Sequence, residues 1–182
     1  GTNGKIEAIK YARTNKIPFL GICYGMQMAI IEFARNVLKL NKASSTELNP
    51  KCIPVIGLIH EWKKDGKTIK GTDKDLGGTM RLGLYEAELL NNSLIKSIYK
   101  SKSIKERHRH RYEVNVNYKK QYEKKGLLFS GNSPDKNLPE IIELKNHPWF
   151  VGVQFHPEFK SRPLSPHPLF SSFIKAAKNH KK

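Results

Sequence analysis

Apolar residues recur along the chain at two spacings, one typical of helices and one typical of strands. A three- and four-residue spacing predicts helices over residues 6–13, 26–37 and 94–99, and again near the C-terminus, where Pro168 begins an amphipathic segment. Short apolar runs between and after these helices predict strands. The runs are residues 17–22, 53–59, 127–130, 140–144 and 149–155, together with the alternating Met80, Leu82 and Leu84.

The segments between these elements are predominantly polar. Residues 41–50 predict a loop, and residues 63–78, which are rich in Lys, Gly and Asp, predict a mobile loop or lid. Alternation of helices and strands followed by a meander indicates an α/β fold, with a mainly parallel sheet flanked by helices and additional antiparallel strands. At 182 residues the chain is expected to form one domain, 1–182.

Cys23 lies between Gly21 and Gly25, where the strand over residues 17–22 meets the next helix. A tight strand-to-helix turn of this kind holds its central residue in a strained, accessible conformation, as in the nucleophile elbow of hydrolases. The positive end of the helix dipole is expected to favour the thiolate. A lone cysteine is often only a small buried hydrophobic residue, but this setting makes Cys23 the candidate nucleophile.

A candidate base lies near the other end of the chain. His156, Pro157 and Glu158 follow the strand over residues 149–155. In an extended chain, side chains two positions apart point to the same side. Glu158 can therefore accept the imidazole N–H of His156 and fix its tautomer, which is the role of the third member of a catalytic triad. Together with Cys23, the pair predicts acyl transfer from an amide.

Two segments that carry these residues, 21–27 and 154–158, resemble the class I (triad) glutamine amidotransferases, whose glutaminase part releases ammonia through a cysteinyl thioester. Three further segments, 75–83, 106–115 and 157–163, are similar to one member of that family. In that member the glutaminase domain supplies ammonia to an ATP-dependent synthetase domain that aminates UTP. The resemblance extends from Gly1 to about residue 178.

The resemblance also implies a glutamine site around the cysteine. Arg111 would hold the α-carboxylate, for which a forked guanidinium is well suited, and Glu47 would meet the α-ammonium. Gln27 lies one helical turn after Cys23 and could hydrogen-bond the same amino acid, while the backbone N–H of Tyr24 would stabilise the oxyanion. The expected glutamine-binding residues are Tyr24, Gly25, Met26, Gln27, Glu47 and Arg111.

The strand-like segment 107–111 alternates arginine with histidine, which places three guanidiniums on one face of an extended backbone. Arg107 and Arg109 could equally meet anionic ligands or pair with nearby glutamates. His108 and His110 are expected to be structural, because His156 already fills the role of the base.

The resemblance implies no cofactor and no metal for residues 1–182. The synthetase domain of the parent enzyme would use ATP and Mg²⁺, with GTP as activator. The implied partners are L-glutamine, the enzyme's own synthetase domain and further copies of the chain, as in the tetramers of the family. In the family, a second oxyanion donor, the opening strands and the synthetase domain all precede the residue that matches Gly1. The chain is therefore expected to be a fragment.

The formal net charge of +17 is the feature that most suggests a different function. A basic chain can bind nucleic acid, but no known nucleic-acid-binding motif accompanies the charge, so we expect no such partner. No apolar stretch is long enough for a membrane helix, and no signal peptide is evident. The two cysteines lie in dissimilar settings, which fits a reducing cytoplasm.

Two alternative functions remain open at this stage. The first is a stand-alone glutaminase or γ-glutamyl hydrolase, against which segments 75–83 and 106–115 argue. The second is a catalytically idle regulatory or assembly module that keeps the fold. The simultaneous presence of Cys23, His156 and Glu158 argues against an idle module, because such a module has no physical need for all three.

Overall fold

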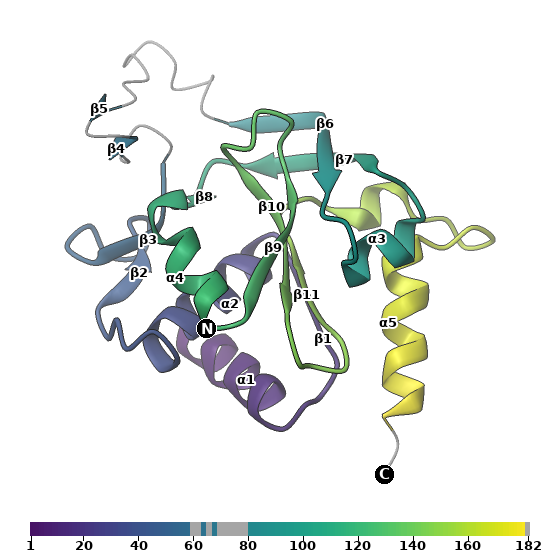
Figure 1. The fold of residues 1–182 in the computed structure, drawn as a ribbon, viewed down its shortest axis with the longest axis horizontal. Coiled ribbons are helices and arrows are strands. Elements are labelled where there is room, and N and C mark those ends of the chain that lie inside the picture. Colours follow the sequence, from purple (N-terminus) through teal and green to yellow (C-terminus); the bar gives the residue numbers. More distant parts are fainter. Residues whose placement is uncertain (59–62, 65–66, 69–79, 181–182) are drawn as a thin grey trace.

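The computed structural model describes residues 1–58, 63–64, 67–68 and 80–180 and has three layers (Figure 1). The main sheet has six strands, in the order β1 (Phe19–Ile22), β11 (Phe150–Val153), β10 (Pro139–Leu144), β9 (Leu127–Asn132), β6 (Arg81–Leu89) and β7 (Ser103–His110). The α-helices are α1 (Thr2–Thr14), α2 (Tyr24–Asn36), α3 (Leu94–Tyr99), α4 (Lys119–Lys124) and α5 (Pro168–Asn179), and the 3₁₀ turns are η3 (Val116–Tyr118) and η4 (Pro157–Lys160).

Two smaller sheets accompany the main one. β2 (Ala43–Ser45), β3 (Ile53–Gly57) and β8 (Glu113–Val114) form the first, in that order, and β4 (Lys63–Lys64) pairs with β5 (Lys67–Thr68) in the second. The first lies beside α2, which packs against both β2 and β3. The residues of the predicted lid, 63–78, otherwise fall outside the described residues.

Each face of the main sheet has its own hydrophobic core. One core joins Ile6 of α1 and Ile30 of α2 to Ile142 of β10. The other core joins Leu169 of α5 to Ile141 of β10. Ile141 and Ile142 belong to different cores because neighbouring side chains of a strand point to opposite faces of the sheet. Figure 1 shows α1 and α2 on one side of the sheet and α3 and α5 on the other.

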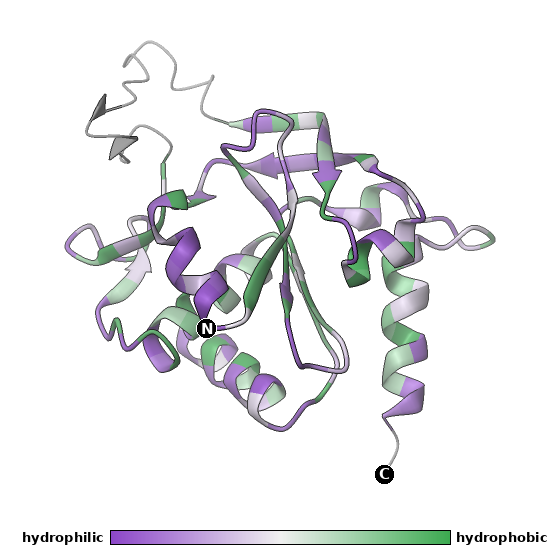
Figure 2. Ribbon diagram, viewed as in Figure 1, coloured by the Kyte–Doolittle hydropathy of each residue, from purple (hydrophilic) through white to green (hydrophobic). Residues whose placement is uncertain are grey.

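The hydropathy pattern follows these layers. α2 is buried over nine consecutive residues, 26–34, since it lies between the main sheet, α1 and the smaller sheet. By contrast, α4 shows mainly hydrophilic residues, and Tyr122 is its buried residue (Figure 2). Each predicted helix is present, and the predicted α/β class is confirmed.

The sheet is mixed rather than mainly parallel. Among the described strands of the main sheet, β1 and β11 form a parallel pair, and each of the other neighbouring pairs is antiparallel. The strands predicted as antiparallel additions therefore make up most of the sheet. Among the elements that were not predicted, β2 lies within the polar segment 41–50, where a loop was expected, and α4 and β8 lie in segments to which no helix or strand was assigned.

The parallel pair β1–β11 places the candidate chemistry. Ile22, the last residue of β1, is in register with Val153, the last residue of β11. The carboxyl ends of two parallel strands meet at the same edge of a sheet. Cys23 and the segment 154–158 therefore leave the sheet side by side, although they are far apart in the sequence.

Candidate active site

Cys23 occupies the turn between β1 and α2 in a conformation that L-residues rarely adopt. Its φ is 49° and its ψ is −100°, a strained combination for a residue with a side chain, which costs about 1–3 kcal/mol. Its backbone N–H donates to the carbonyl of Val153, at 2.7 Å, and this bond fixes the turn to the end of β11. The predicted nucleophile elbow is present.

Gly21 makes this sharp turn possible. A Cβ atom at Gly21 would lie 2.8 Å from the carbonyl carbon of Gly25, in the first turn of α2, which is closer than real contacts allow. A Cβ at Gly25 would meet nothing within 4 Å. Gly21 is therefore required for close packing of the helix on the strand, whereas a side chain at Gly25 would extend into open space.

His156 and Glu158 form the predicted pair. The imidazole Nδ1–H of His156 donates to Oε1 of Glu158 at 2.6 Å, so Nε2 is the nitrogen left to act on a thiol. The backbone N–H of His156 donates to the carbonyl of Arg107, at 2.8 Å, and the ring of Phe159 lies 5.2 Å from the imidazole between centroids. The side chain of Glu158 is 45% exposed, so solvent weakens its hold on the imidazole.

The surroundings of the thiol differ from the sequence-based expectation. Burial raises the pKa of Cys23 to about 11, and the nearby Glu113 and Glu158 carboxylates act in the same direction. Two hydrogen bonds lower this pKa, each by less than burial raises it. They come from the backbone of Tyr24 at the helix N-terminus and from the amide of Gln154, which lies 3.6 Å from Sγ. The helix end thus favours the thiolate as expected, but burial outweighs it, so attack requires a base to remove the proton.

Four of the predicted glutamine-binding residues follow Cys23 in the first turn of α2. The side chain of Met26 is fully buried in the core, so a bound glutamine could contact only the backbone of Met26. The amide of Gln27 is also buried and donates to the carbonyl of Tyr112 at 2.9 Å. The hydroxyl of Tyr24 shares a hydrogen bond with Thr2 at 3.0 Å.

The two charged residues predicted to hold the amino acid lie on the surface. Glu47 follows β2 and is exposed, and its backbone N–H donates to the hydroxyl of Ser45 at 3.2 Å. Arg111 immediately follows β7 and is also exposed. Of the alternating segment 107–111, the arginines are exposed and the two histidines are buried, as the strand periodicity predicted.

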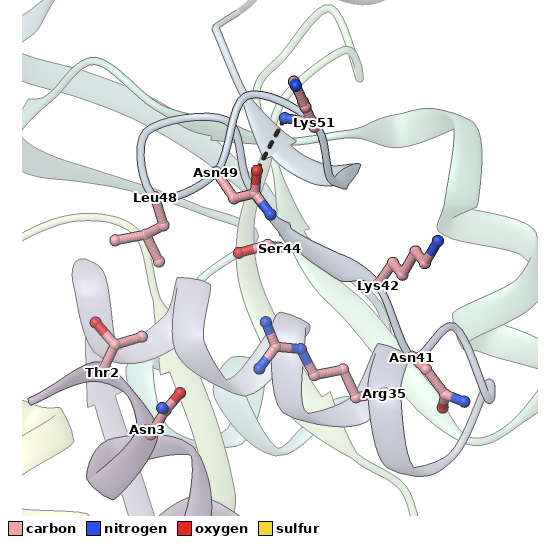
Figure 3. A pocket seen from close by; sticks show the side chains of 9 residues that line it. All are labelled: Thr2, Asn3, Arg35, Asn41, Lys42, Ser44, Leu48, Asn49 and Lys51. Atoms are coloured by element: carbon pink, nitrogen blue, oxygen red, sulfur yellow. Dashed lines mark hydrogen bonds between the residues drawn. The ribbon is translucent and has the colours of Figure 1, made fainter.

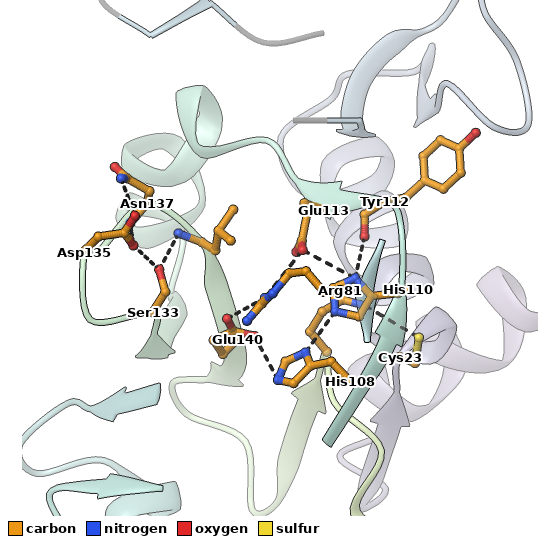
Figure 4. A network of polar contacts seen from close by, with 12 residues as sticks. Cys23, Arg81, His108, His110, Tyr112, Glu113, Ser133, Asp135, Asn137 and Glu140 are labelled. Carbon is orange, nitrogen blue, oxygen red and sulfur yellow. Dashed lines mark hydrogen bonds and ion pairs between the residues drawn. The ribbon is translucent and has the colours of Figure 1, made fainter. Parts of the chain in front are cut away.

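A buried polar network lies next to the cysteine, and its centre is Arg81 (Figure 4). The guanidinium of Arg81 is 2.7 Å from Oε1 of Glu140 and 3.4 Å from Oε1 of Glu113. Both carboxylates are almost completely buried, and each has a second oxygen with no hydrogen-bond partner in the described part of the chain.

The two buried histidines extend this network towards the active site. Nδ1 of His110 donates to the carbonyl of Tyr112 at 3.2 Å, so its Nε2 is free to accept from Nδ1 of His108, 2.9 Å away. Nε2 of His108 faces Oε2 of Glu140 at 3.7 Å. The contact between the two imidazoles requires that one of the facing nitrogens carries a proton and that the other does not.

Burial sets the protonation of the whole network. It lowers the pKa of His108 to about 2 and of His110 to about 3, helped in both cases by the charge of Arg81. It raises the pKa of Glu113 to about 8 and of Glu140 to about 7, although Arg81 opposes the rise. The network therefore carries less charge than its residue types suggest.

The network contains residues that sequence reasoning gave no role. They are Arg81, Glu113, Glu140 and Gln154. Three of them carried a signal, because Arg81, Glu113 and Gln154 lie in the segments 75–83, 106–115 and 154–158 that the sequence analysis singled out. Arg81 begins the strand that the alternating Leu82 and Leu84 predicted. In the structure both leucines are more than half exposed, and Arg81 points inward to the buried carboxylates.

A separate pocket lies away from these residues. It has a volume of about 620 Å³ and is lined by Arg35, Lys42, Lys51 and uncharged residues (Figure 3). No member of the Cys23–His156–Glu158 set lines it, so it is separate from the candidate chemistry. Among the described residues, no group of three His, Cys, Asp or Glu side chains is placed to hold a metal ion. Within the same residues, every helix is too short or too polar to cross a bilayer.

Comparison with known proteins agrees with the fold and the motif. Residues 1–176 match the family model for glutamine amidotransferase class-I. A strained cysteine at a strand–helix turn, a neighbouring His–Glu pair and a mixed sheet between helices define the same class. The chain belongs to the class I glutamine amidotransferase family.

Within that family, similar proteins include CTP synthases. The CTP synthase of Pelagibacter ubique is 78% identical over 181 residues, and that of Zymomonas mobilis is 61% identical over 178 residues. These matches cover 100% and 97% of this chain, but only 34% and 33% of the relatives. The chain thus spans about a third of the length of its curated relatives.

A solved structure agrees with this assignment. The glutaminase domain of Trypanosoma brucei CTPS, solved with bound acivicin, superposes with a TM-score of 0.86 at 34% sequence identity. The match covers 100% of this chain and 68% of that one. The chain corresponds to the glutamine amidotransferase part of its CTP synthase homologues.

Proposed function

We propose that the chain hydrolyses L-glutamine through a thioester on Cys23 and supplies the ammonia to a synthetase domain that converts UTP to CTP. One observation carries the proposal. Cys23 lies in a strained turn at the end of β1, and the 2.6 Å His156–Glu158 pair follows the end of β11, which is the parallel neighbour of β1. This is the arrangement that acyl transfer from an amide needs.

The first half of the reaction forms the thioester. Nε2 of His156 takes the proton of the Cys23 thiol, and Sγ attacks the carboxamide carbon of glutamine. The backbone N–H of Tyr24 is the proposed donor to the oxyanion. Removal of one such donor from a protease lowers the stabilisation of the transition state by about 3–4 kcal/mol. The C–N bond then breaks, and His156 returns the proton to the departing nitrogen, which leaves as ammonia.

The second half regenerates the enzyme. His156 takes a proton from water, and the resulting hydroxide attacks the thioester carbon. The C–S bond breaks, glutamate leaves, and the proton returns to Cys23. Because the pKa of the thiol is raised to about 11, the imidazole is needed in both halves, and Glu158 stabilises the imidazolium each time.

For glutamine itself, we propose that Arg111 binds the α-carboxylate and Glu47 the α-ammonium. Exposure of both side chains supports the proposal, because each can be reached from solvent. Tyr24, Gly25, Met26 and Gln27 would form the floor of the site. The buried amide of Gln27 supports a role in holding Gln154 near the thiol, since their amides lie 3.4 Å apart.

The remaining parts of the proposal concern the longer enzyme. The similar CTP synthases are about three times as long as this chain, which supports a synthetase domain on the same polypeptide. That domain would use ATP and Mg²⁺, with GTP as activator. We propose that the enzyme works in the cytoplasm as a homo-oligomer, as the resemblance implies.

The test is a Cys23→Ser variant of the longer enzyme, with Cys52→Ser as the matched control. Glutamine-dependent CTP formation should fall by at least about 1000-fold, because the hydroxyl is a much weaker nucleophile at this site. CTP formation from added ammonia should be unchanged, since that step does not use the thiol. Cys52→Ser should preserve both activities. Loss of the ammonia-dependent activity in Cys23→Ser would contradict the proposal.

A further inference from the structure

A second cluster of buried polar groups lies behind the His156–Glu158 turn, and its centre is Glu106 of β7. The side chain of Glu106 is 2% exposed. Its Oε1 accepts from the hydroxyl of Tyr99 at 3.1 Å and from Nε2 of His167 at 2.9 Å. Its Oε2 accepts no hydrogen bond in the described part of the chain, and the charge that faces it is Nζ of Lys160, at 3.4 Å.

Lys160 is the last residue of η4, the turn that carries Glu158. Its Nζ also donates to the backbone carbonyl of Lys105 at 2.5 Å. At the other end of the turn, the backbone N–H of His156 donates to the carbonyl of Arg107. Three consecutive residues of β7, 105–107, therefore hold both ends of the turn over residues 156–160.

The cluster fixes this clamp to the rest of the fold. Tyr99 belongs to α3, and His167 caps the N-terminus of α5 by accepting from the backbone N–H of Leu169 at 3.3 Å. The backbone N–H of His167 in turn donates to the hydroxyl of Ser161, which follows η4, at 3.1 Å. Glu106 is thus attached to two helices and cannot move with the turn alone.

The His156–Glu158 pair needs such support. With 45% of the Glu158 side chain exposed, the pair resembles a surface ion pair, whose interaction is too weak to hold one geometry in water. The backbone of the turn must therefore set the direction of the imidazole. Within the described residues, Lys160 is the side chain that ties the far end of this turn to β7.

We infer that Lys160 and Glu106 are positioning residues, which hold the turn over residues 156–160 so that the imidazole of His156 is aligned with Cys23. The inference rests on the proposed function. Neither residue touches the thiol or the imidazole; each acts through the backbone of the turn. The same contact joins the segments 106–115 and 157–163, since Glu106 belongs to one and Lys160 to the other.

The test uses the full enzyme with the variants Lys160→Met, Lys160→Arg, Glu106→Gln and the matched control Lys105→Met. Lys160→Met keeps the aliphatic stem but removes the ammonium. It should lower kcat for glutamine hydrolysis about 10- to 100-fold, because small displacements of a catalytic group have effects of this size. KM for glutamine should stay within about two-fold, since no glutamine contact is removed.

The other variants separate positioning from charge and from folding. Lys160→Arg retains several N–H donors and should restore kcat to within about three-fold of the wild type. Lys105→Met removes the same charge one residue from Glu106 but leaves the backbone carbonyl, so kcat should not change. Lys160→Met combined with Glu106→Gln should lower kcat no further than the stronger single variant, because both act through one contact.

A readout independent of glutamine is the rate at which iodoacetamide alkylates Cys23 at neutral pH, which should fall in Lys160→Met and recover in Lys160→Arg. A Lys160→Met enzyme that loses thermal stability but keeps kcat and the alkylation rate would overturn the inference. If the wild type hydrolyses no glutamine, the proposed function fails, and the alkylation rates alone decide whether Lys160 positions the base.

Discussion

At the scale of single residues, the main finding is that the nucleophile is held in a backbone conformation that its own side chain disfavours. Glycine adopts positive φ without penalty, so a residue with a side chain at φ 49° needs a chemical reason to be there. The thiol of Cys23 supplies that reason. Activity at this position and stability of the fold are therefore opposed.

This opposition can be measured with two variants that both lack the thiol. Cys23→Gly should be more stable than Cys23→Ala by about 1 kcal/mol, because relief of about 1–3 kcal/mol of strain exceeds the extra entropy of glycine in the unfolded chain, about 0.4–1 kcal/mol. Urea denaturation of both proteins measures the difference. Equal unfolding free energies would mean that the turn is not strained.

At the scale of elements, α1 is attached to α2 by an ion pair as well as by apolar contacts. The guanidinium of Arg13 forms two parallel hydrogen bonds with the carboxylate of Glu32, at 2.8 and 2.7 Å. The side chain of Glu32 is completely buried. A buried carboxylate that loses its partner is left uncompensated, so the pair makes the docking of α1 specific.

Arg13→Met should therefore lower the free energy of unfolding by about 3 kcal/mol, the lower end of the range for a broken buried pair, because Asn36 still donates to Glu32. The matched control is Lys10→Met, which breaks an exposed pair with Glu7 on the same helix. Lys10→Met should change the free energy of unfolding by less than about 1 kcal/mol. Similar effects of the two substitutions in thermal or chemical denaturation would contradict this account.

The elements also show where sequence reasoning succeeds. The helices α1, α2, α3 and α5 and the Cys23 elbow were predicted because their signals are local: apolar spacing, flanking glycines and a helix directly after a strand. The strand β6 was also predicted, but its orientation was not, since the leucines at 82 and 84 follow a strand period and yet face solvent. The inward face is decided by Glu113 and Glu140, which Arg81 must neutralise, and such partners cannot be identified from spacing within one strand.

At the scale of the whole molecule, the polar network around Arg81 joins the two larger sheets. Glu113 belongs to β8 of the smaller sheet, whereas Arg81, His108 and Glu140 belong to the main sheet. The network thus connects the sheets beside the active site. Its neutral imidazoles make this connection dependent on pH.

The pH dependence follows from His108, which faces Glu140, His110, Arg81 and the ring of Tyr85. Its pKa is lowered to about 2 in the folded protein, against about 6.5 in an unfolded chain. Below pH 6.5 the unfolded chain therefore binds a proton that the fold excludes, so the contribution of His108 to stability is complete above pH 6.5 and is lost as the pH falls.

Relative to a His108→Gln variant, the wild type should lose about 2 kcal/mol of unfolding free energy between pH 7 and pH 5. Taking the difference between the two proteins largely removes the opposing titration of Glu113 and Glu140, which both proteins share. Urea denaturation at each pH gives the measurement. A difference that stays constant with pH would show that His108 titrates alike in the folded and unfolded states.

The distance along the sequence between Cys23 and Gln154 has a consequence for biosynthesis. The two residues are 131 positions apart, and they meet only because β11 pairs with β1. In a nascent chain, Cys23 is synthesised more than a hundred residues before His156. Such long-range pairing also forms slowly. An incomplete or misfolded chain therefore holds the Cys23 thiol without the imidazole that would act on it.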